Sequence, residues 1–76
     1  MNKLELQTIL DIKGVPEAIY SLNGLKHGEC LCVVHENNKW KVLYNSRGRI
    51  SYIEECTGEE AAYDLFFKIM KEDYGW

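Results

Sequence analysis

The chain has 76 residues, of which 46% are hydrophobic and 28% charged, a composition typical of one globular domain, residues 1–76. A domain this small buries only roughly 60% of its unfolded surface, which argues against an enclosed active site. The formal net charge is -3. The absence of an apolar run of membrane-spanning length and an amino terminus unlike a secretory signal predict a cytoplasmic protein with no membrane contact.

The first predicted element is a short helix over residues 4–12. Leu6 and Leu10 follow helical spacing within it, and Gly14 two residues later is typical of a helix end. Residues 16–28 then predict one further helical turn and a polar loop.

The middle of the chain predicts a three-stranded antiparallel meander. Residues 30–36, 39–45 and 49–56 are rich in β-branched and aromatic residues, and Asn37-Asn38 tolerates the positive φ of a tight hairpin turn. If these two residues form the turn, the core face pairs Leu31 with Tyr44, Val33 with Val42 and His35 with Trp40. The other face pairs Cys32 with Leu43, Val34 with Lys41 and Glu36 with Lys39.

The last predicted element is a helix to about residue 71. Thr57 and Glu60 have the spacing of a capping box at its start. Its sheet-facing arc is expected to contain Ala61, Ala62, Leu65, Phe66 and Ile69, extended by Tyr63, Phe67, Met70 and Tyr74. The extension either packs under the first helix or forms a partner-binding stripe. The predicted fold is α+β: an N-terminal helix, the three-stranded antiparallel meander, and a C-terminal helix packed on one face of the sheet.

No catalytic, metal or cofactor site is expected. Cys30, Cys32 and Cys56 lack paired spacing and are read as reduced thiols, and two histidines do not complete a zinc site. Strand alternation places Cys32 and His35 on opposite faces, which excludes a nucleophilic dyad. The glycines form no phosphate-binding pattern.

The order of helix, three strands and helix is also that of double-stranded-RNA-binding domains. Those domains carry a lysine cluster at the start of the second helix, whereas this chain has Thr57-Gly58-Glu59-Glu60 there. Because acidic residues repel a phosphate backbone, nucleic acid is not the expected partner.

Three segments, residues 14–22, residues 36–48 with the string ENNKWKVLY and Arg47-Gly48, and residues 57–62 reading TGEEAA, together resemble small bacterial immunity proteins of polymorphic-toxin and contact-dependent growth-inhibition systems. The resemblance implies a protein that binds and neutralises a cognate toxin C-terminal domain, commonly a nuclease, inside the producing cell. Whether the protein is a monomer or a homodimer stays open.

Charge is segregated in a way that fits this implication. Residues 54–73 hold seven acids and two lysines, a net charge of -5, and an acidic surface is attracted to the basic active site of a nuclease. This interpretation requires carboxylates that are not neutralised by basic neighbours in the same chain. The predicted contact residues are the acids Glu54, Glu55, Glu59, Glu60 and Asp64, with Tyr63, Phe67 or Trp76 as apolar anchors.

The alternative is a nucleic-acid-binding or regulatory protein that uses the basic hairpin, residues 39–49. Its cations are Lys39, Lys41, Arg47 and Arg49, and Trp40 or Tyr44 would stack on a base.

Overall fold

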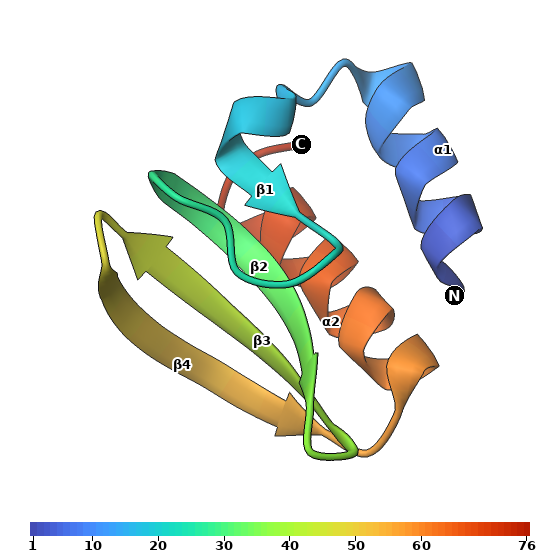
Figure 1. The fold of residues 1–76 in the computed structure, drawn as a ribbon. Helices are drawn as coiled ribbons and strands as arrows, with labels where there is room; N and C mark the ends of the chain where they lie inside the picture. Colours follow the sequence, from blue (N-terminus) through green and yellow to red (C-terminus); the bar gives the residue numbers. More distant parts are fainter.

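The computed structural model describes the backbone of residues 1–76 and every side chain other than that of residue 52. Two helices lie on one side of a four-stranded sheet (Figure 1). No helix in the described part of the chain is long and apolar enough to cross a membrane. The elements in chain order are α1 (Lys3–Lys13), the 3-10 turn η1 (Glu17–Ile19), β1 (Tyr20–Ser21), β2 (Glu29–Glu36), β3 (Lys39–Ser46), β4 (Arg49–Cys56) and α2 (Glu59–Glu72).

Both ends of α1 are satisfied by local contacts. The Oδ1 atom of Asn2 accepts a hydrogen bond of 2.8 Å from the Glu5 amide, and the Gly14 amide donates back to the last turn from a left-handed conformation with φ 71°. Leu6 and Leu10 are fully buried on the inner side of this helix. The predicted helix and its end at Gly14 are therefore confirmed.

The sheet differs from the prediction. Its strand order is β1-β2-β3-β4, and β1 runs parallel to β2, so the sheet is mixed and has four strands; the prediction of a three-stranded antiparallel meander is wrong. The missing strand, Tyr20–Ser21, has only two residues and is too short to show an alternating pattern. A parallel neighbour normally follows a helical crossover, and the sequence between β1 and β2 contains no helical pattern.

The β2–β3 hairpin has the predicted register. Asn37 and Asn38 form its two-residue turn with φ of 52° and 60°, and all six predicted cross-strand pairs are observed. The next turn, Arg47-Gly48, also has positive φ at both positions. The pairing of β3 with β4 shifts by one residue between Val42 and Leu43, which is a β-bulge.

The loop from β1 to β2 covers the sheet face that lies away from α2 (Figure 1). The Asn45 side-chain amide donates to the Lys26 carbonyl at 2.7 Å, and Asn45 is 2% exposed. Cys30, Cys32 and Leu43 form a small buried cluster on this face. The loop therefore gives the sheet a second apolar layer that the sequence did not reveal.

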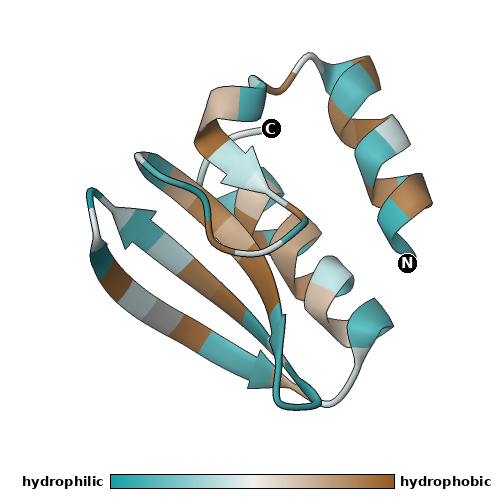
Figure 2. Cartoon of the chain, in the orientation of Figure 1, coloured by the Kyte–Doolittle hydropathy of each residue, from teal (hydrophilic) through white to brown (hydrophobic). Residues whose placement is uncertain are grey.

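The main core lies between the sheet and the two helices, with apolar residues concentrated in the middle of β2 (Figure 2). Phe66 is fully buried on α2, and its ring meets that of Tyr20 edge-on with centroids 6.1 Å apart. The helix is rotated from the predicted orientation, because Ala61 is exposed whereas Tyr63 and Met70 are buried. The α2 residues that form the core are Ala62, Tyr63, Phe66, Ile69 and Met70.

The start of α2 also differs from the prediction. Its N-cap is Gly58, which provides no side-chain hydrogen bond, so the predicted capping box of Thr57 and Glu60 is wrong. The helix begins one residue after the position that a Thr57 cap requires. Glu59 and Glu60 still lie in the first turn, where negative charge is favourable to the helix dipole.

These two helix starts predict a contrast between matched alanine variants. Asn2→Ala removes an observed cap and should lower the free energy of unfolding by about 1 kcal/mol. Thr57→Ala removes no cap, so its loss should stay within about 0.5 kcal/mol. Urea titrations followed by circular dichroism compare the two, and equal losses would contradict the assignment of Gly58 as N-cap.

Candidate partner-binding surface

Five acidic residues lie at the end of the molecule where β4 leads into α2 (Figure 1), with Glu54 and Glu55 on opposite faces of β4. Only Cys56, Thr57 and Gly58 separate the last acid of β4 from the first residues of α2. All five side chains are exposed. We call this surface the acidic patch; it consists of Glu54, Glu55, Glu59, Glu60 and Asp64.

Cations of the chain lie against the acidic patch. The Met1 amino group is 3.0 Å from Asp64 Oδ1 and 3.8 Å from Glu60 Oε1, and Lys39 Nζ is 3.8 Å from Glu55 Oε1. The condition of unneutralised carboxylates is thus met only in part. Lys41 is also opposite Glu55 in the β3–β4 pairing and lines a hollow with Glu54 and Glu55. The five carboxylates still outnumber these nearby cations, and exposed ion pairs of this kind are weak.

The Met1 amino group responds to this environment. Its hydrogen bond to Asp64 is the main reason that its pKa lies above the ordinary value, and the charges of Asp64, Glu60 and Glu5 act in the same direction. The amino group therefore stays protonated to a higher pH than usual. Its positive charge therefore offsets part of the negative charge of the patch.

The predicted apolar anchors do not join the acidic patch as a group. Tyr63 is only 2% exposed: its ring meets that of Trp40 edge-on at 5.8 Å, and its hydroxyl lies 3.5 Å from the Leu22 carbonyl oxygen. Burial and, to a smaller extent, the charge of Glu59 raise the pKa of Tyr63. Tyr63 is a core residue and is not available as a surface anchor in this conformation.

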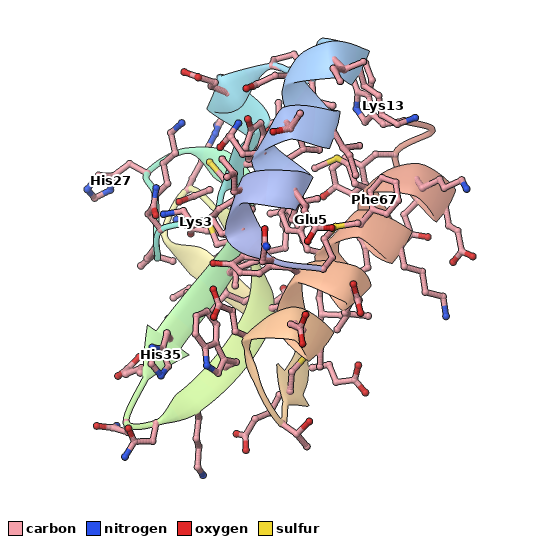
Figure 3. All side chains as sticks on the ribbon, turned by 90° about the vertical axis from the view of Figure 1, so that its right-hand side faces the viewer. Lys3, Glu5, Lys13, His27, His35 and Phe67 are labelled. Atoms are coloured by element: carbon pink, nitrogen blue, oxygen red, sulfur yellow. The ribbon has the colours of Figure 1, made fainter. Side chains whose placement is uncertain are left out.

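Phe67 and Trp76 lie elsewhere. Phe67 is half-buried on α2, beside α1 (Figure 3). Trp76 is 36% exposed, and its amide donates to the Met70 carbonyl at the far end of α2, roughly 20 Å along the helix from Glu59. Its own carbonyl accepts from Lys13 Nζ at 2.7 Å. Trp76 is therefore remote from the acidic patch.

A hollow of about 340 Å³ adjoins the acidic patch at Glu59. Trp40 forms part of its wall, and the His35 imidazole stacks on the Trp40 indole with centroids 4.2 Å apart and planes 4° apart. Lys3, whose ammonium donates to Asn23 Oδ1, lies on another side of the hollow. Figure 3 shows Lys3 and His35 on the same side of the molecule. Sequence reasoning missed this hollow because five separate segments of the chain line it.

The basic hairpin does not present one surface. Lys39 lies at the start of β3, whereas Arg47 follows its end, roughly 25 Å away along the strand. Lys39 contacts Glu55, and Arg47 Nε lies 4.0 Å from Glu29 Oε1. Trp40 is partly buried between His35 and Tyr63, so it is not free to stack on a base. This geometry does not favour the nucleic-acid alternative.

The Cys30 thiol lies 3.5 Å from the backbone carbonyl oxygen of His27, whose side chain is exposed. Cys30 and Cys32 are buried in the cluster beneath the loop, on the opposite face of the sheet from the stacked His35. Among the described side chains there is no group of three or more His, Cys, Asp or Glu residues arranged to hold a metal ion.

Cys56 offers a pH-dependent test of the acidic patch. Burial and, to a smaller extent, the charge of Glu54 raise the pKa of its thiol. Glu54→Gln should lower that pKa and speed alkylation by iodoacetamide at pH 8 by about twofold, since surface charges are screened by salt. Glu55→Gln is the control, because Glu55 pairs with Lys41 on the other face of β4. Alkylation rates are measured by mass spectrometry between pH 7 and 10.

The raised thiol pKa values also determine in which direction the stability of the fold changes with pH. Cys32 and Cys56 hold their protons more tightly when the chain is folded, mainly because of burial. In the unfolded chain these thiols ionise at a lower pH. Their contribution to stability is therefore complete below the ordinary thiol pKa and decreases as the pH rises through the raised values.

Comparison of the chain with models of protein families, with curated proteins and with solved structures found no match.

Proposed function

We propose that this chain is an immunity-type protein that binds a cognate bacterial toxin domain, of the nuclease class, and neutralises it by covering its basic active site. The observation that carries the proposal is the acidic patch. It brings carboxylates from β4 and α2 to one exposed end, where they outnumber the nearby cations of Met1, Lys39 and Lys41. A site that holds phosphates is basic, so this end is attracted to it.

The hollow beside Glu59 supports a contact that is more than electrostatic. A projecting side chain of the toxin inserted there lies between the Trp40 indole and the Glu59 carboxylate. Arginine fits this position, because its guanidinium pairs with carboxylates such as that of Glu59. Glu59 thus belongs both to the acidic patch and to the wall of the hollow.

The proposal is tested by capture from the native host. The chain, immobilised through its carboxy terminus, is expected to retain one protein in stoichiometric amount, identified by mass spectrometry as a toxin C-terminal domain. The purified domain should have nuclease activity that the chain abolishes at a one-to-one ratio. If the retained protein is not a toxin, or if the toxin stays active when bound, the proposal is wrong.

A matched bait separates the acidic patch from general charge effects. Glu59→Lys with Glu60→Lys should lose the captured protein at moderate salt. Glu72→Lys with Asp73→Lys makes the same change of charge at the opposite end of α2 and should retain it. Equal retention by both baits would show that the acidic patch is not the contact.

A further inference from the structure

The outer edge of β4 is open. In the strand order β1-β2-β3-β4, this strand is hydrogen-bonded to β3 on one side, and no described strand pairs with its other side (Figure 1). It is eight residues long, Arg49–Cys56. The opposite edge of the sheet differs, because β1 has only two residues there.

The backbone of this edge offers unpaired hydrogen-bonding groups. Ser46 and Arg49 flank the two-residue turn and are directly paired, so the N–H and C=O groups of Arg49 point toward β3. The direction alternates along a strand, so the N–H and C=O groups of Ile50 point outward. A second extended segment can pair with them.

Two apolar side chains of β4 are exposed and favour such pairing. Ile50 is 38% exposed and Ile53 is 45% exposed, whereas Arg49, Glu54 and Glu55 are charged and restrict which partner can pair. The bulge at Ile53 interrupts the regular edge after residue 52. The segment available for regular pairing is therefore residues 49–52.

The charges of the strand select the partner. Arg49 lies at one end, and Glu54 lies near the other end on the same face, because Arg49 is opposite Ser46 and Glu54 is opposite Val42. An antiparallel second β4 centred on Ser51 places Arg49 of each copy opposite the bulge at Ile53 and Glu54 of the other, where Glu54 shares the face of Arg49. A parallel arrangement would align like charges, which is unfavourable.

We propose that two copies of this chain form a symmetric dimer by antiparallel pairing of their β4 strands, with Ser51 of one copy opposite Ser51 of the second. The two sheets then join into one continuous sheet of eight strands, with two Arg49–Glu54 ion pairs across the junction. Such self-complementary contact is the common geometry of homodimers. It does not depend on the proposed toxin binding and can be measured with the chain alone.

Sedimentation velocity across micromolar to millimolar concentration tests the dimer. At high concentration the mass should approach twice the 8.9 kDa of one chain. Arg49→Glu or Glu54→Arg alone should weaken association roughly tenfold, because each places like charges together at both ends of the junction. The double variant Arg49→Glu with Glu54→Arg should restore it, and Glu72→Arg on α2 is a control that should leave it unchanged.

Ile50→Pro gives an independent test. The substitution removes an N–H that points away from β3, so every hydrogen bond of the β3–β4 ladder is kept. The hydrogen bond that this N–H would donate across the dimer junction is lost. Circular dichroism verifies that the variant folds, and it should sediment as a monomer. A chain that stays monomeric throughout, or a dimer that survives both single charge changes, would overturn the proposal.

Discussion

Reversing the charges of Glu59 and Glu60 together should slow association with the cognate toxin between roughly tenfold and a hundredfold at low salt. The change replaces two exposed negative charges of the acidic patch with positive ones, so long-range attraction becomes repulsion. Stopped-flow or surface-based kinetics at several salt concentrations measure the effect. The difference from the wild-type chain should shrink as salt rises, because the Debye length falls to about 8 Å near physiological ionic strength.

The control is Glu72→Lys with Asp73→Lys, which alters the net charge equally but at the other end of α2. It should change the association rate by much less. An association rate for Glu59→Lys with Glu60→Lys that equals that of the control would exclude the acidic patch as the steering surface.

Replacing Phe66 with alanine should cost about 3–5 kcal/mol of unfolding free energy. Phe66 is fully buried at the centre of the core, where its ring meets Tyr20, and its loss leaves a cavity between α2 and the sheet. A chain of this size is expected to have only about 4–11 kcal/mol of stability. Urea denaturation should therefore show a large fall in the midpoint with little change in slope.

Phe67→Ala is the matched comparison, since it makes the same substitution on the next residue of α2. Phe67 is only half-buried at the margin of the core, so its removal should cost about half as much or less. If the two losses were equal, the burial described for α2 would be incorrect.

The β2–β3 hairpin was predictable because its turn determines its register. Asn37 and Asn38 both adopt the positive φ that a two-residue hairpin needs, and once they form the turn every cross-strand pair follows from strand alternation. The same reasoning gave the bounds of β4. All the residues that determine such a hairpin lie within a short stretch of the sequence.

The first strand and the loop after it were not predictable in the same way. Tyr20–Ser21 becomes a strand only because β2 lies beside it, and the loop is held over the sheet by tertiary contacts such as Asn45 to Lys26. No local pattern encodes either contact. Parallel pairing across a short irregular connection also departs from the usual helical crossover.

For the candidate surface, the positions of the acidic residues were predicted better from the sequence than those of the apolar anchor residues. Glu54 to Asp64 lie close together in the chain, so a single turn between a strand and a helix brings them to one end. Whether Tyr63 is exposed depends on the rotation of α2 about its axis. Tyr63 is buried in the core, whereas Glu59, four residues earlier, is exposed. The periodicity of an amphipathic helix gives the width of its apolar arc more reliably than its exact orientation.

The position of Met1 has a practical consequence for any tagged form of the protein. Its amino group lies 3.0 Å from Asp64, so residues added ahead of Met1 emerge beside the acidic patch and remove a positive charge from it. The other terminus is tied near Met70 and Lys13, at the opposite end of α2. Labels, linkers and surface attachments therefore belong after Trp76, where they leave the patch unobstructed.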